Sequence, residues 1–164
     1  MEKRSCAAKS DPMGAAFEAA RAAGARGEVP VGAAIVREGE VIASAGNSTI
    51  ADGDPTAHAE MLAIRAAARA LGAERLSDCE LYVTLEPCAM CAAAISLARI
   101  RRLYYAASDE KGGAVEHGAR FFSQPTCHHA PEVYEGFRAS EAAALLRAFF
   151  AERREMGRGS KSGL

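Results

Sequence analysis

Residues 79–91 read CELYVTLEPCAMC, in which an alternating run is followed by a proline and by two cysteines three positions apart. The alternation is typical of a β-strand, and Pro87 is typical of the first position of a helix. We therefore expect a strand that leads directly into a helix, with Cys88 and Cys91 in the first helical turn. Two thiols at this spacing can form a redox pair, half of a structural zinc site, most of a catalytic one, or ordinary helix packing.

Similar patterns place the other elements of the chain. Asp11 and Pro12 indicate a helix start, and residues 37–40 separate two β-prone runs as the turn of a hairpin. The expected helices cover about 12–26, 57–72, 87–99 and 140–154, and the expected strands cover about 31–37, 40–45, 79–85 and 101–107. Strands separated by helices should lie parallel. We therefore predict an α/β fold, a three-layer α/β/α sandwich around a mixed sheet.

The composition is that of one globular domain. A chain of 164 residues, 49% of them hydrophobic, can bury one core, so we expect a single domain over 1–164 with flexible ends at 1–10 and 157–164. The 20 basic and 21 acidic residues leave a net charge of -1, so any contact with a polyanion must be local. Without a secretory signal or a membrane-spanning run, we expect a cytoplasmic protein with no membrane partner. Five irregularly spaced cysteines favour metal binding or catalysis over disulfides.

His58 and Glu60 supply the partners that the two cysteines need. One imidazole and two thiolates give three ligands for a tetrahedral zinc ion, and no further Cys or His lies beside His58 to close the site. Because both motifs are expected at helix starts, the helix dipoles would favour thiolate over thiol. A carboxylate that does not bind the zinc ion can accept and return the protons of a zinc-bound water, so Glu60 is the expected catalytic residue.

Several stretches together resemble the bacterial tRNA-specific adenosine deaminases, the TadA family. They are Glu28-Val29-Pro30-Val31-Gly32-Ala33, Asn47, Asp54 to Glu60, Thr84 to Cys91, and Asp109 with Lys111, Gly113 and Ala114. The pair His-x-Glu and Pro-Cys-x-x-Cys also resembles the signature of zinc-dependent base deaminases. The resemblance implies a cytidine-deaminase-like fold with a mixed five-stranded sheet, a homodimer, and one Zn2+ per subunit. It further implies conversion of the wobble adenosine in a tRNA anticodon stem-loop to inosine.

The same resemblance implies roles for single residues. The positions that match the zinc ligands and the proton shuttle are His58, Cys88 and Cys91 for the metal and Glu60 for the proton. The positions that match substrate contacts are Asn47, Val31 and Ala59 in the base pocket and Asp109 near the flanking nucleotides. From the residues alone, Asn47 could equally cap the loop that follows its strand.

Residues 115–122 depart from the family pattern, because Val115-Glu116-His117-Gly118 stands where the family usually has Gly-Ser. The arginine and two phenylalanines that follow could contact RNA or anchor the loop to the core. A local basic surface is expected from Arg147, Arg153, Arg154, Arg158 and Lys161. Two other functions stay open: a deaminase of free guanine or cytosine, and a zinc module that binds RNA or a partner protein without catalysis.

Overall fold

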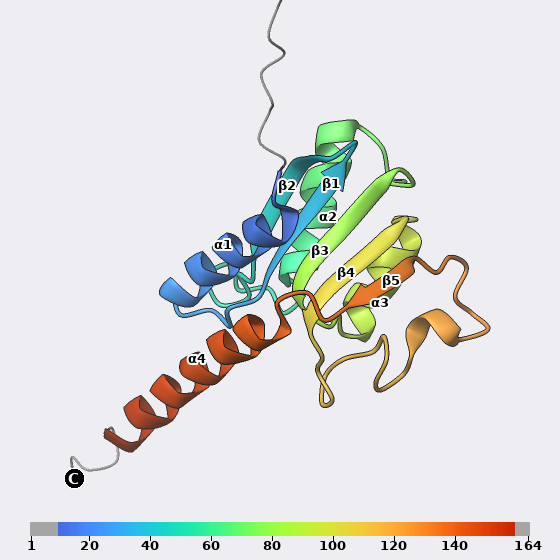
Figure 1. Ribbon diagram of the computed structural model, residues 1–164. Helices are drawn as coiled ribbons and strands as arrows, with labels where there is room; N and C mark the ends of the chain where they lie inside the picture. The colour runs from blue at the N-terminus through green and yellow to red at the C-terminus, as the bar shows by residue number, and fades with distance from the viewer. Residues whose placement is uncertain (1–9, 160–164) are drawn as a thin grey trace, which may run out of the picture.

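The β-strands of the chain join into one mixed sheet with the order β2-β1-β3-β4-β5 (Figure 1). A computed structural model describes residues 10–159. The strands are β1 (Gly32–Arg37), β2 (Glu40–Gly46), β3 (Cys79–Leu85), β4 (Arg102–Ala107) and β5 (Glu132–Glu135). The helices are α1 (Pro12–Ala25), α2 (Ala59–Leu71), α3 (Ala89–Leu97), α4 (Ala139–Gly159) and the short 3-10 helix η1 (Phe121–Ser123).

The direction of the strands brings several strand ends to one edge of the sheet. β1 runs antiparallel to both β2 and β3, whereas β3, β4 and β5 are parallel. β2 therefore runs in the same direction as β3, and the loops that lead into α2 and α3 both leave the sheet at the same edge. Ligand sites of open α/β sheets lie at such an edge.

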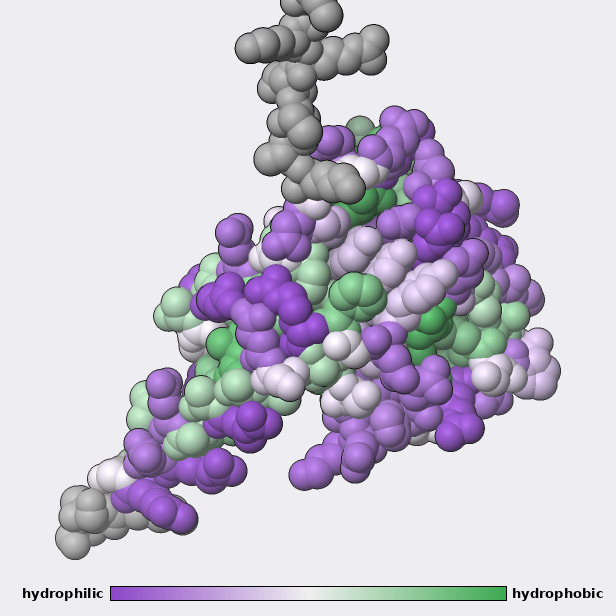
Figure 2. All heavy atoms as spheres, viewed as in Figure 1, coloured by the Kyte–Doolittle hydropathy of each residue, from purple (hydrophilic) through white to green (hydrophobic). Residues whose placement is uncertain are grey.

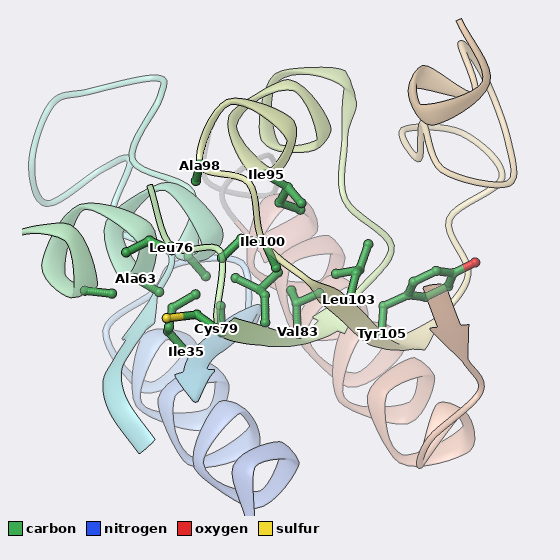
Figure 3. Close-up of a cluster of buried hydrophobic side chains, with 14 of the residues drawn as sticks. Ile35, Ala63, Leu76, Cys79, Val83, Ile95, Ala98, Ile100, Leu103 and Tyr105 are labelled. Carbon is green, nitrogen blue, oxygen red and sulfur yellow. The ribbon is translucent and has the colours of Figure 1, made fainter. Parts of the chain in front are cut away.

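Helices cover both faces of the sheet. α1 and α4 lie in front of the sheet in Figure 1 and contact each other, while α2 and α3 lie behind it. Ile35 and Val83 join the larger buried cluster, on the side of α2 and α3 (Figure 3), and Ala34 joins the smaller cluster with Phe17 of α1. This alternation follows from the two-residue period of a strand. The predicted three-layer α/β/α fold is confirmed.

Two glycines allow α1 to approach the sheet closely. A Cβ atom on Gly32 would lie 1.9 Å from the Ala16 carbonyl oxygen, and one on Gly46 would lie 2.4 Å from that of Ala19. Both contacts are with helix backbone, which has no side-chain freedom to move aside. The strand positions that face α1 here must therefore be glycine.

The structure differs from the expected elements in four places. β5 lies where no strand was expected, because it has only four residues, glutamates at both ends and an exposed outer edge. Pro87 precedes the N-cap residue Cys88 and is not the first residue of α3. On α2 the fully buried stripe consists of alanines, and the larger side chains Met61 and Ile64 lie beside it, only partly buried.

The fourth difference concerns the C-terminal end of the chain. α4 continues to Gly159, so residues 157–159 of the segment expected to be flexible are helical. The rest of the two segments expected to be flexible, apart from Ser10, lies outside the described residues, as do Cys6 and Lys161. Within 10–159 no helix combines the length and apolarity that crossing a bilayer requires.

Candidate active site

Three side chains from two successive helix starts converge behind the sheet edge. His58 Nδ1 lies 3.7 Å from Cys88 Sγ and 3.6 Å from Cys91 Sγ. Among residues 10–159, these three form the only group of three or more His, Cys, Asp or Glu residues whose ligand atoms lie within 4.8 Å of one another. Cys91 is buried, whereas His58 and Cys88 are partly exposed. The grouping predicted from the sequence is confirmed.

The distances within this group suit a tetrahedral zinc ion. Zinc bonds of about 2.0–2.1 Å to nitrogen and about 2.3 Å to sulfur, at tetrahedral angles, separate the two ligand atoms by about 3.6 Å. The observed separations of 3.7 and 3.6 Å match this value. One imidazole and two thiols are also the donor set that zinc prefers over calcium or magnesium. The three residues therefore fit zinc with one coordination position left over for a non-protein ligand.

The ligands are available because neither of the helix-start residues caps its own helix. His58 is the N-cap residue of α2 and Cys88 that of α3, and neither side chain makes a capping hydrogen bond. Both have extended backbone angles, which turn the side chain beyond the helix end. The positive ends of the two helix dipoles thus face the group and favour thiolate sulfur.

Cys88 and Cys91 are hydrogen-bonded to each other, which shifts their pKa values in opposite directions. A hydrogen bond from Cys91 lowers the pKa of Cys88 to about 5, and the same bond, together with burial, raises the pKa of Cys91. The lowered pKa of Cys88 favours the thiolate form that a metal ligand must have.

Glu60 is the second residue of α2 and is only 4% exposed. Burial is the largest cause that raises its pKa, to about 7, and the negative charge of Cys88 adds to the effect. A carboxyl group with a pKa close to neutrality can both accept and return a proton at physiological pH. Its position in the first turn of α2 points it toward the same helix end as His58.

Asn47 carries out the capping that His58 does not. Its Oδ1 accepts a hydrogen bond of 2.8 Å from the backbone N–H of Ala59, the first residue of α2. Its backbone N–H donates to the Val31 carbonyl at 3.0 Å, so the three predicted base-pocket residues are directly connected. Val31 and Ala59 are buried, at 5% and 0% exposure. The bond to Ala59 fixes Oδ1 as the acceptor, so the amide NH2 of Asn47 faces the other way.

Asp109 lies in a different part of the site, after β4. Its Oδ1 accepts hydrogen bonds from the backbone N–H groups of Lys111 and Gly112. It borders a groove of about 810 Å³ between its loop and α4. The groove has an apolar floor and a basic rim, and its lining includes Leu85, Leu146, Phe150, Lys111, Arg147 and Arg154. Figure 2 shows hydrophilic residues along much of α4 where it projects from the body.

Sequence reasoning gave no role to two buried carboxylates beside the site. Glu28 accepts hydrogen bonds from the backbone of Ile50 and Ala51. Glu86, between β3 and Cys88, accepts hydrogen bonds from the loop that contains Asp109. Both are 2% exposed. The sequence did contain a signal for their burial. Each glutamate lies directly beside an apolar strand and a proline-containing turn, where the chain is expected to be buried and a charged side chain is unusual.

The segment Cys127-His128-His129 forms no second ligand group among the described residues. Cys127 contacts Ser96 Oγ and the His129 carbonyl, and the His129 ring donates to the Ile100 carbonyl at 2.7 Å. These contacts anchor the loop after η1 to the end of α3. The segment thus has a structural role away from the metal ligands.

Comparison with known proteins agrees with this geometry. The family model of the cytidine and deoxycytidylate deaminase zinc-binding region matches residues 7–107. The tRNA-specific adenosine deaminase of Agrobacterium fabrum is 64% identical over 142 residues, which cover 87% of this chain and 93% of that protein.

Two solved structures extend the comparison. One, from biochemical and structural studies of A-to-I editing by tRNA:A34 deaminases at the wobble position of transfer RNA, has a TM-score of 0.81 and 64% identity. It covers 82% of this chain and 98% of its own. The guanine deaminase of Nitrosomonas europaea has a TM-score of 0.71 at 28% identity, over 92% of this chain and 88% of that one. The chain therefore belongs to the cytidine and deoxycytidylate deaminase family, within the group of the tRNA-specific adenosine deaminases.

Proposed function

We propose that this protein deaminates the wobble adenosine of a tRNA anticodon stem-loop to inosine. The observation that carries the proposal is the triangle of His58, Cys88 and Cys91 at two helix starts, with the buried carboxyl group of Glu60 beside it. The relatives that cover nearly the whole chain at 64% identity act on tRNA by name, which supports the choice of substrate.

His58, Cys88 and Cys91 would hold the zinc ion. A zinc ion held there would supply Lewis-acid chemistry, lowering the pKa of a water molecule that reacts at C6 of adenine. Glu60 accepts a proton from this water and delivers it to the adjacent ring nitrogen, which prepares C6 for attack. Glu60 then transfers the second proton to the exocyclic nitrogen, which leaves as ammonia while C6 becomes the carbonyl carbon of inosine.

Asn47 is proposed to orient the base. Because its Oδ1 is held by the Ala59 N–H, its NH2 group is the part that remains to donate a hydrogen bond to an acceptor on the purine. Val31 and Ala59 are proposed as the apolar surroundings of the same pocket. Their deep burial supports a role in fixing the position of Asn47 and of the helix start.

The groove beside Asp109 supports RNA over a free base as the substrate. Its rim carries Lys111, Arg147 and Arg154, and its floor includes the partly exposed ring of Phe150. Cations can contact the phosphates of a single-stranded loop, and an aromatic ring can stack on an unpaired base. A free base carries no phosphate groups that could bind the basic residues of this rim. Asp109 is proposed to lie near the nucleotides that flank the reacting adenosine.

A deaminase of free guanine is the second candidate, because the Nitrosomonas europaea guanine deaminase shares the fold at 28% identity. The same zinc site would serve both reactions, so the difference must lie in the substrate contacts. The basic groove is the feature that disfavours this candidate.

We further propose a homodimer, as the family resemblance implies. α3 carries a stripe of apolar residues on one helical face, formed by Met90, Ala93, Ala94 and Leu97, with Leu97 75% exposed. Residues at this spacing share a face, and an exposed leucine among small residues suits contact with the same stripe of a second copy. Replacing Leu97 with Asp should yield a monomer by light scattering, and an unchanged mass would contradict the proposed interface. A cytoplasmic location stays a prediction.

The assay offers the zinc-loaded protein a tRNA anticodon stem-loop with adenosine at the wobble position, and in parallel free guanine, cytosine and adenine. Inosine is measured by mass spectrometry of the digested RNA, and ammonia is measured in every reaction. We expect inosine at the wobble position only. Ammonia from a free base, with unmodified RNA, would refute the proposal in favour of a small-molecule deaminase.

A further inference from the structure

Glu86 is a buried carboxylate that the deamination steps do not use. It follows the last residue of β3 and precedes the metal ligand Cys88 by two positions. Its side chain has no exposed surface. A carboxylate in such a place is retained only when hydrogen-bond donors replace water, so the identity of its donors indicates its role.

All four donors to Glu86 come from one loop. Oε1 accepts from the backbone N–H groups of Glu116 at 2.7 Å and His117 at 3.1 Å. Oε2 accepts from the backbone N–H of Asp109 at 2.8 Å and from Nδ1 of the His117 ring at 2.9 Å. Hydrogen bonding to these donors lowers the pKa of Glu86, so it stays ionised. The Glu86 carboxylate therefore accepts hydrogen bonds from both ends of the 109–117 loop and holds the two ends together.

The loop is also packed directly against this carboxylate. A Cβ atom on Gly113 would lie 2.3 Å from Glu86 Oε2 and 2.5 Å from the Asp109 carbonyl oxygen. The next residue, Ala114, donates its N–H to the Pro87 carbonyl at 2.9 Å. The loop thus packs along the turn that leads into Cys88, where position 113 has no space for a side chain.

The anchored loop is the one that borders the basic groove. Asp109 and Lys111 lie on the groove side and face α4. His117 belongs to the segment in which this chain departs from the family pattern, and its ring bonds Glu86 from the far end of the loop. The position of the groove wall relative to the metal ligands is therefore set through Glu86.

We propose that Glu86 is a positioning residue. Together with His117 it holds the 109–117 loop in the position in which the loop binds the nucleotides beside the reacting adenosine. This inference rests on the proposed tRNA substrate. The hydrogen bonds of Glu86 go to the 109–117 loop and not to His58, Cys88 or Cys91. It acts through the loop, so its loss should weaken substrate binding more than the chemical step.

The test compares Glu86→Gln with the wild type. Each oxygen of Glu86 accepts two donors, so either orientation of a Gln amide directs an NH2 group at two of them. We expect KM for the anticodon stem-loop to rise by about tenfold or more, with kcat changed by less than about threefold. Zinc content should stay at that of the wild type. Hydrogen exchange at the amides of Asp109, Glu116 and His117 should become faster.

Two further variants separate anchoring from general damage. Gly113→Ala retains Glu86, but the added methyl group would clash with its carboxylate and displace the loop. This variant should therefore reproduce the rise in KM and the faster hydrogen exchange. Glu132→Gln removes an exposed carboxylate of β5 that bonds Arg102 of β4, outside the lining of the groove, and should change neither KM nor the exchange of the loop. If Glu86→Gln does not fold, the KM and loop exchange of Gly113→Ala decide whether anchoring of the loop supports substrate binding.

The outcomes are distinguishable. An unchanged KM with unchanged loop exchange would refute the anchoring role. A fall in kcat with loss of zinc and an unchanged KM would also refute it, because Glu86 would then support the metal ligands. If the wild type deaminates only free bases, the proposed function fails, whereas the exchange measurements still decide whether Glu86 holds the loop.

Discussion

Replacing Asn47 should separate its structural role from its role in substrate binding. In Asn47→Ala the N–H of Ala59 loses its acceptor, and Ala59 is fully buried in the wild type. An unsatisfied buried donor costs about 2 kcal/mol. For a chain of this size, that cost lowers Tm by roughly 4–8 °C. The kcat/KM for the anticodon stem-loop should fall as well, because the NH2 donor is lost.

Asn47→Asp removes only the NH2 donor and keeps the acceptor for the Ala59 N–H, so it tests the role in substrate binding alone. The carboxylate still accepts the hydrogen bond from Ala59, and a negative charge is favourable at the start of α2. We therefore expect the free energy of unfolding to stay within about 0.5 kcal/mol of the wild type. The NH2 group is nevertheless gone, so kcat/KM should fall by about ten- to hundredfold. Thermal unfolding and steady-state deamination, measured on the same preparations, test both statements.

Asp11→Ala is the matched control. Asp11 accepts from Gly14 at 2.9 Å and caps α1, so the variant loses a helix cap outside the active site. It should lose about 1 kcal/mol of stability with unchanged kcat/KM. Full activity of Asn47→Asp would refute the proposed contact with the base. An unchanged Tm of Asn47→Ala would refute the argument that Asn47 stabilises the start of α2.

The other predictions concern the proton shuttle, the groove and the loop. Glu60→Gln should retain zinc by elemental analysis while kcat falls by about 10²–10⁴-fold, and substantial residual turnover would contradict the role of Glu60. Arg154→Gln should raise KM for the stem-loop and reduce the slope of log KM against log salt by about 0.7, whereas Arg37→Gln, at the hairpin, should do neither. The hydrogen bond to Glu86 raises the pKa of His117 above its usual value. Protonated His117 therefore adds stability that is complete below the unfolded-state pKa of about 6.5 and is lost as the pH rises through the folded-state pKa. The Tm difference between wild type and His117→Ser should accordingly shrink from pH 6 to alkaline pH, and a constant difference would show that the charge of His117 does not contribute.

Local sequence patterns predicted the elements that carry their own signal. β3 begins and ends at the predicted residues, because Cys79 to Leu85 alternate and a proline-containing turn stops the strand. The three metal ligands were predicted because their chemical types are rare in combination and their helix starts are marked by the sequence. Both kinds of signal lie within short stretches of the chain.

Features that depend on tertiary contacts were not predictable in the same way. β5 has only four residues and is a strand because β4 lies beside it. On α2 the fully buried apolar residues are Ala59, Ala63 and Ala67, whereas the larger Ile64 and Leu71 pack against the same core only partly buried. Glu86 contacts residues 23 to 31 positions later in the chain, and no local pattern indicates this.

The composition of β5 also limits how this protein can associate with copies of itself. β5 is the last strand of the sheet, and its free edge is only four residues long with an exposed glutamate at each end. A short edge with charged side chains offers few unpaired backbone groups to a second copy, which protects against edge-to-edge aggregation. Concentrated protein should therefore resist growth into sheet-like fibres from this side.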